Sequence, residues 1–147
     1  MTRYHVEPPL APRNGRLLRA VGITRISTLN QDVKSLADQQ ALLRKWVEDR
    51  YDGPVEWTFI EGQGSGECLD REQVAEAEEL VASGQVHLVA MEDLSRHMRR
   101  VHAVLFCEQC EDADTRLIAI NDGIDTCKDW RLHAFFAAMK HEQSNKD

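Results

Sequence analysis

An arginine and a serine two residues apart, Arg25 and Ser27, lie at the end of the first apolar run of the chain, Leu17 to Ile26. Reactive groups of open α/β sheets collect at the carboxyl ends of strands, where a serine hydroxyl can act as a nucleophile. Residues i and i+2 of a strand point to the same face, so the Arg25 guanidinium can reach the anion that Ser27 attacks. The pair predicts a serine that attacks a phosphate. The plainer interpretation is a polar residue that ends a strand.

Further arginines are expected to gather near Ser27, because one begins the second predicted helix and the others follow the third predicted strand. They are Arg71, Arg96, Arg99 and Arg100. Several guanidiniums around one serine suit phosphoryl transfer, in which positioning and charge neutralisation supply most of the catalysis. No carboxylates or histidines in the sequence have the spacing of a metal cage, so we expect attack without a metal. A solvated helix face is the other explanation of the basic cluster.

Apolar runs and segments of helical periodicity alternate along the chain. The apolar runs predict strands over residues 17–26, 55–60, 86–91 and 115–120. The periodic segments predict helices over residues 36–50, 71–83, 96–113 and 129–147, the first two with the N-caps Ser35 and Asp70. This alternation predicts an α/β fold: a mainly parallel sheet of four to five strands, helices on both faces and a long C-terminal helix.

The chain has 147 residues and a formal net charge of −7. The length fits one domain, expected over residues 17–147, while residues 1–16, with Pro8, Pro9 and Gly15, are expected to form a flexible leader. No apolar run approaches the roughly 18 residues that span a bilayer, and no signal segment begins the chain, so we expect a cytoplasmic protein. The acidic balance argues against a protein that holds nucleic acid by its overall charge.

Two other motifs offer different chemistry. The run Gly62-Gln63-Gly64-Ser65-Gly66 follows a predicted strand, as phosphate-binding loops do, but it lacks the endings and spacings of nucleotide sites, so we expect a mobile loop near the active face. Cys107 and Cys110 fall inside a predicted helix and could join Cys127 and His133 in a zinc site. Helical cysteines are more often small core residues. A CxxC metal or redox module therefore stays open as an alternative.

Together these residues resemble the catalytic domain of the serine site-specific recombinases, the resolvase and invertase family, and within it the large serine recombinases. The resemblance covers about residues 18–147 and rests on the order and spacing of short motifs. These are Arg25-Ile26-Ser27-Thr28 with Gln31, Ser35-Leu36 with Gln39, Ser65-Gly66 with Asp70-Arg71, Leu94-Ser95-Arg96, and Asp122-Gly123-Ile124-Asp125-Thr126.

The resemblance implies that Ser27 attacks a phosphodiester of double-stranded DNA, giving a 5′-phosphoserine link and a free 3′-hydroxyl, and that strands are exchanged and rejoined in a tetramer. It implies phosphate binding by Arg25, Arg71 and Arg96, and support of the nucleophile by Gln39. Because the covalent link conserves the energy of the broken bond, no cofactor is expected. The C-terminal helix is expected to form a homodimer or homotetramer interface and to lead to a DNA-binding region that this sequence does not include.

One departure from the family pattern keeps a second function open. Glu92-Asp93 stand where the family has Asp-Arg, so one expected arginine is absent from its place. Arg99 and Arg100 follow about one helical turn later and are candidate DNA contacts that could substitute for it. The alternative function is that of a catalytically inactive relative, acting as a DNA-associated or dimerisation module.

Overall fold

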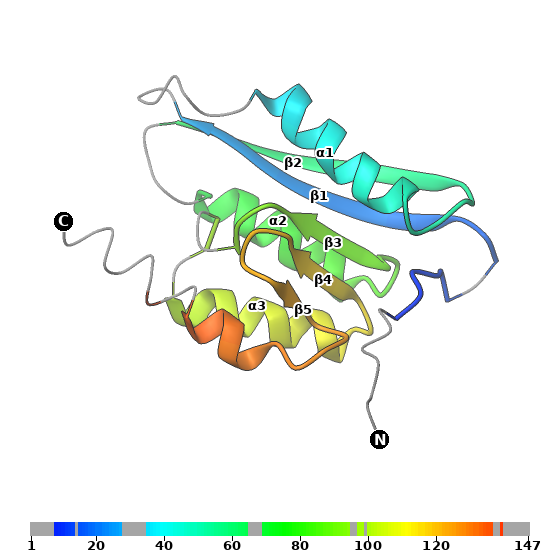
Figure 1. Ribbon diagram of the computed structural model, residues 1–147. Coiled ribbons are helices and arrows are strands. Elements are labelled where there is room, and N and C mark those ends of the chain that lie inside the picture. Colours follow the sequence, from blue (N-terminus) through cyan, green and yellow to red (C-terminus); the bar gives the residue numbers. More distant parts are fainter. Residues whose placement is uncertain are drawn as a thin grey trace.

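The fold is built on one five-stranded sheet with the strand order β2-β1-β3-β4-β5 (Figure 1). The computed structural model describes residues 8–13, 15–27, 35–64, 69–94, 97–98, 100–136 and 139, without the side chains of residues 27, 63, 64 and 100. The strands are β1 (Leu18–Ser27), β2 (Val55–Gly64), β3 (Leu88–Met91), β4 (Arg116–Ala119) and β5 (Ile124–Asp125). The helices are α1 (Leu36–Glu48), α2 (Arg71–Ala82) and α3 (Arg100–Asp112).

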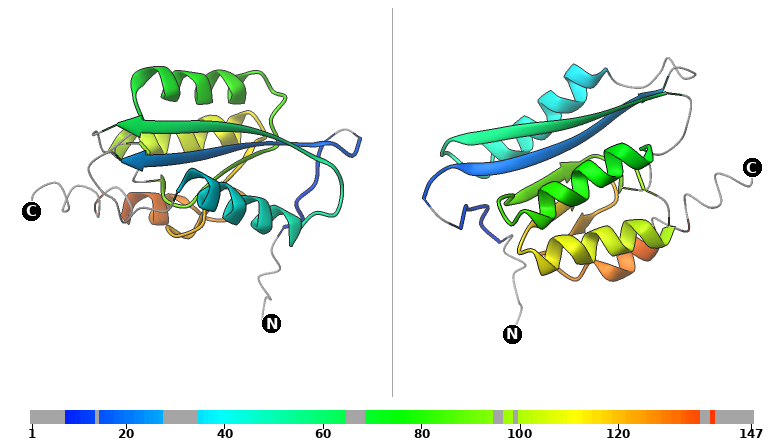
Figure 2. Two further views of the ribbon diagram at one scale, coloured as in Figure 1. Left: turned by 90° about the horizontal axis from the view of Figure 1, so that it is seen from above. Right: turned by 180° about the vertical axis from the view of Figure 1, so that it is seen from behind.

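The sheet is parallel except at one edge, and helices cover both of its faces. Strands β1 to β4 pair in parallel, while β5 pairs with β4 in the antiparallel sense. Figure 2 shows α1 on one side of the sheet and α2 on the other. The predicted α/β class, with a mainly parallel sheet and helices on both faces, is confirmed. None of the helices in the described ranges is long and apolar enough to cross a membrane.

The two faces of the sheet bury two separate apolar cores. Under α1, the side chains of Leu43 and Val47 pack with Leu18, Ala20 and other residues of the sheet. On the opposite face, residues of α2 and α3 pack against alternate sheet residues and against the region after β5. This larger core includes Val21, Ile23, Ala77, Phe106 and Trp130. The alternation along β1 therefore assigns its even-numbered residues to α1 and its odd-numbered residues to α2 and α3.

Both predicted N-caps are confirmed, because each depends only on residues within one helical turn. The Ser35 hydroxyl accepts a hydrogen bond from the Asp38 amide at 3.1 Å. Asp70 forms a reciprocal capping box with Gln73, in which each side chain accepts from the other residue's backbone amide. These caps set where α1 and α2 begin, and therefore where Arg71 lies.

Two predicted boundaries are wrong for tertiary reasons. The glycine-rich run after Ile60 was expected to be a loop, but β2 continues through Gly64 because β1 pairs with it residue by residue as far as Ser27. The third helix was expected from Arg96, but α3 begins at Arg100. Before it, the amides of His97 and Met98 both donate to the Leu94 carbonyl at 3.0 Å, which forms a tight turn.

The two ends of the chain are described only in part. Within the predicted leader, Leu10 is buried and the Pro8 carbonyl accepts a hydrogen bond from Arg116 at 2.9 Å, so these residues contact the domain. The boundary at residue 17 stays a prediction. Helical residues 131–136 and 139 follow β5, and residues 140–147 lie outside the described residues. The long C-terminal helix is therefore not confirmed.

Candidate active site

The strand that carries Ser27 ends at an open edge of the sheet. Ser27 is the last residue of β1, and its Cα pairs with that of Gly64 at the end of β2. Strand β1 pairs with β3 only over residues 20–22, so its last residues extend beyond β3 (Figure 1). The backbone of Ser27 thus lies at the carboxyl edge of the sheet, as the sequence predicts. The structure does not describe its side chain.

A buried glutamine on α1 holds the backbone of β1 just before Ser27. Gln39 accepts a hydrogen bond from the Arg25 amide at 3.0 Å and donates one to the Arg25 carbonyl at 2.8 Å. Odd-numbered residues of β1 direct their backbone amide and carbonyl groups toward β3. The Arg19 carbonyl, for example, accepts from the amide of His87, the residue before β3, at 2.9 Å. At Arg25 the pairing with β3 has ended, so the Gln39 amide takes the place of a neighbouring strand. Gln39 therefore fixes the strand end that carries Ser27.

Two of the predicted arginines have side chains free to bind an anion. Arg25 is half-buried and Arg71, the first residue of α2, is exposed. Within the described part of the chain, no hydrogen bond or ion pair engages either guanidinium. Buried or bridged arginines elsewhere, such as Arg116 with Asp125, have carboxylate partners instead. A guanidinium without a protein acceptor is available for a phosphate.

A hydrogen bond joins the segments that precede α2 and α3. The Leu69 amide donates to the His97 carbonyl at 3.0 Å, two residues before Arg71 on one side and three before Arg100 on the other. This contact brings the start of α2 to the segment after β3. Arg96 and Arg99 lie outside the described residues, and the Arg100 side chain is not described, so the structure does not place these three guanidiniums.

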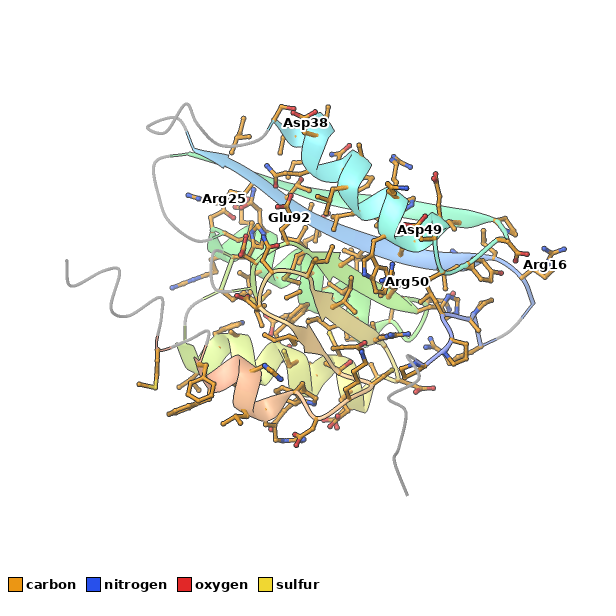
Figure 3. The ribbon with its side chains drawn as sticks, in the orientation of Figure 1. Arg16, Arg25, Asp38, Asp49, Arg50 and Glu92 are labelled. Atoms are coloured by element: carbon orange, nitrogen blue, oxygen red, sulfur yellow. The ribbon has the colours of Figure 1, made fainter. Side chains whose placement is uncertain are left out.

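The segment Glu92–Leu94, which follows β3, forms hydrogen bonds with the turn after β4. The Asn121 side chain donates to Asp93 Oδ2 at 3.2 Å, and the Asn121 amide donates to the Glu92 carbonyl at 2.7 Å. Asp122 accepts from the Leu94 amide at 2.7 Å. Figure 3 shows Glu92 and Arg25 at the same carboxyl edge of the sheet. The segment Glu92–Leu94 is thus anchored, with Asp93 engaged in a structural hydrogen bond.

The cysteine motif lies in the apolar core. Cys107 and Cys110 are fully buried on α3, and burial raises the pKa of Cys107 to about 12 and that of Cys110 further still. Cys127 is exposed. Across the described residues, no group of three His, Cys, Asp or Glu side chains is arranged to hold a metal ion. The burial of the two helical thiols favours the interpretation as small core residues.

Sequence reasoning missed one residue of this edge, Gln73. Its side chain reaches back from α2 and donates to the Glu61 carbonyl of β2 at 3.0 Å. The spacing Asp70-x-x-Gln73 is that of a capping box and could have identified its role at the helix start. No local pattern predicts its contact with β2.

Comparison with known proteins agrees with this geometry. The family model of the resolvase N-terminal domain matches residues 20–146. Among curated protein sequences, none matches the chain. Among solved structures, a resolvase family site-specific recombinase from Streptococcus pneumoniae is 26% identical with a TM-score of 0.59, covering 88% of this chain and 89% of that one.

Two further structures are similar in fold. The N-terminal catalytic domain of TP901-1 integrase has a TM-score of 0.57 at 19% identity, covering 87% of this chain and 97% of that one. A serine recombinase from Sulfolobus solfataricus has a TM-score of 0.53 at 20% identity, covering 71% and 69%. From the family match over nearly its whole length, the chain belongs to the resolvase N-terminal domain family, the catalytic domains of serine site-specific recombinases.

Proposed function

We propose that this chain is an active catalytic domain that cleaves and rejoins double-stranded DNA through Ser27. The observation that carries the proposal is that no side chain or backbone group among the described residues engages the guanidinium of Arg25, on β1, or that of Arg71, at the start of α2. Arg25 lies two residues before Ser27, and Arg71 begins the helix that follows β2. Two guanidiniums beside a strand-end serine can neutralise the phosphate oxygens on which negative charge develops during attack.

The proposed reaction exchanges one ester bond for another. The Ser27 Oγ attacks the phosphorus of a phosphodiester and loses its proton, while the bond from phosphorus to the 3′ oxygen breaks and that oxygen gains a proton. The products are a 5′-phosphoserine link and a free 3′-hydroxyl. In rejoining, a 3′-hydroxyl attacks the phosphoserine and the Ser27 oxygen leaves as a hydroxyl. The number of ester bonds is unchanged, so no cofactor is needed to supply energy.

Besides Ser27, four residues have roles in this mechanism: three arginines bind the phosphate and one glutamine supports the nucleophile. Arg25 and Arg71 bind the phosphate, and Arg96 is assigned the same role by its position in the motif Leu94-Ser95-Arg96. Gln39 supports the nucleophile through the backbone: its two hydrogen bonds to Arg25 hold the end of β1 in place. Positioning of this kind favours the in-line geometry that phosphoryl transfer requires.

We further propose that the region after β5 mediates homodimer or homotetramer formation. Large apolar side chains are exposed there and on α3. They are Val101, Leu105, Leu132, Phe135, Phe136 and Met139. Exposed apolar clusters of this kind mark association surfaces. Sedimentation equilibrium of Phe135→Glu against the parent chain tests this, and an unchanged oligomeric state would remove the proposed interface.

A catalytically inactive relative is the second candidate function. The observation in its favour is Asp93, which stands where the family has an arginine and which Asn121 binds through its side chain. Such a protein would still associate with DNA or with itself, but it would form no covalent intermediate.

The test uses the longest native form of the protein, incubated with a pool of random double-stranded DNA and then denatured. Mass spectrometry then searches for nucleotide attached to serine. We expect an adduct on Ser27 that is absent in Ser27→Ala and retained in Ser83→Ala, the control at an exposed serine after the last residue of α2. A folded, DNA-bound protein without any serine adduct would refute the catalytic proposal and favour the inactive relative.

A further inference from the structure

Gln73 connects the start of α2 to the edge strand of the sheet. Its Oε1 accepts from the Asp70 backbone amide at 3.1 Å, and the backbone amide of Gln73 donates to Asp70 Oδ1 at 2.9 Å. The remaining group, Nε2, donates to the Glu61 carbonyl at 3.0 Å. One side chain thus caps the helix that begins with Arg71 and binds the backbone of β2.

The Glu61 carbonyl is available because β2 is an edge strand. The Leu18 amide donates to the Pro54 carbonyl at 2.9 Å, so even-numbered residues of β2 direct their backbone groups toward β1. Glu61 is odd-numbered and directs its carbonyl away from β1, toward the side on which the sheet has no further strand in the described residues. The side-chain amide of Gln73 therefore binds an acceptor that none of the described strands uses.

The same contact lies beside the Arg25 side chain. Arg25 pairs in register with Gly62, the residue after Glu61. A Cβ on Gly62 would lie 2.8 Å from Leu69 Cδ2, 3.3 Å from Arg25 Cγ and 3.5 Å from Gln73 Oε1. The three side chains therefore converge over the bare backbone of Gly62. The base of the Arg25 side chain and the start of α2 share one packing site.

We propose that Gln73 is a positioning residue that sets the spacing between the guanidiniums of Arg25 and Arg71. The inference rests on the proposed function, in which these two side chains bind one phosphate. The capping box alone holds Gln73 to its own helix, whereas the bond to Glu61 holds the helix to the strand beside Arg25. Loss of that bond leaves the first turn of α2 without a hydrogen bond from its side chains to β2. A displacement of about 1 Å at a phosphate-binding group can lower a rate about a hundredfold.

Two substitutions separate the bond to β2 from the cap and from charge. Gln73→Glu keeps an acceptor for the Asp70 amide, since glutamate also forms capping boxes, but it cannot donate to Glu61. Gln73→Met has a similar length and adds no charge, and it loses both contacts. The matched control is Gln109→Glu on α3. The same change there removes a side-chain donor, to Glu78 Oε2, at a position far from Ser27 in the sequence.

The readouts are the rate of Ser27–DNA adduct formation, the midpoint of thermal unfolding, and the binding of inorganic phosphate followed by NMR of the arginine Nε–H signals. We expect both Gln73 variants to form adduct about tenfold to a hundredfold more slowly than Gln109→Glu, with Gln73→Glu unfolding within a few degrees of the parent. DNA affinity should change less than the adduct rate, because positioning acts on the chemical step.

The outcomes that overturn the inference differ from the failure of the proposed function. Adduct formation at the parent rate in Gln73→Glu would overturn it. A slow Gln73→Glu beside a fast Gln73→Met would assign the effect to charge and also overturn it. If the parent protein forms no adduct, the proposed function fails, and phosphate binding decides: weakening of about fivefold or more in Gln73→Met supports the positioning role, and unchanged binding refutes it.

Discussion

Removal of the Gln39 side chain should release the end of β1 from α1. Gln39 is only 8% exposed and makes two hydrogen bonds to the Arg25 backbone, at 3.0 and 2.8 Å. At about 1 kcal/mol for each bond, Gln39→Ala should lower the free energy of unfolding by about 2 kcal/mol. Gln39→Glu keeps the acceptor but places a carboxylate oxygen against the Arg25 carbonyl, and should lose about 3 kcal/mol.

Urea unfolding followed by far-UV circular dichroism measures these changes, with Gln85→Glu as the control for added charge at an exposed glutamine. That control should stay within about 0.5 kcal/mol of the parent. Hydrogen exchange at the Arg25 amide separates local release from global destabilisation: exchange should accelerate in Gln39→Ala more than at core amides of β3. Stability of Gln39→Ala within about 0.5 kcal/mol of the parent, with Arg25 exchange unchanged, would refute the reasoning.

Two further predictions concern the opposite end of the sheet. The buried pair Arg116–Asp125, with contacts of 3.0 and 2.7 Å, should make Asp125→Ala less stable by about 3–5 kcal/mol in urea unfolding, because Arg116 is left buried without its carboxylate; a loss under about 1 kcal/mol would contradict this. Burial, together with Arg13 and Arg19, lowers the pKa of His87 below its ordinary value of 6.5. Because the folded state binds this proton less tightly than the unfolded chain, the neutral form of His87 stabilises the fold. That stabilisation is fully present above pH 6.5 and is lost as the pH falls through the lowered pKa of the folded state. Between about pH 7 and pH 5 the free energy of unfolding should fall more in the parent than in His87→Gln. Equal falls in the two proteins would show that His87 is not the group responsible.

Local signals account for most of the correct element predictions. Ser35 and Asp70 were identified as caps because each satisfies amides within its own first turn, so no distant residue is needed. The alternation of apolar runs with periodic segments was enough for the α/β class, since each strand must be covered by the helices beside it. Strand β5, only Ile124–Asp125, is too short for a periodic pattern and was not predicted as a strand.

The extent of β2 and the start of α3 required tertiary information. Gly62 and Gly64 have low strand propensity, yet they continue β2 because Arg25 and Ser27 on β1 supply the pairing partners. The turn before α3 depends on Leu94 and on the contact of His97 with Leu69, more than twenty residues earlier in the chain. Hydrophobic periodicity within a short stretch of sequence cannot predict either of these long-range contacts.

For the site, the sequence by itself determined which residues we propose for the chemistry: Arg25 and Ser27 on one strand end, and Arg71 at a capped helix start. It also contains the ordered motifs of the family. These depend on residue type and short spacing. The resemblance implied a supporting role for Gln39, but only the tertiary structure decided how it acts, through two bonds to the Arg25 backbone, and that Gln73 binds Glu61. Both glutamines bind backbone groups that lack a strand partner, and which groups lack one is known only once the strand order and register are set.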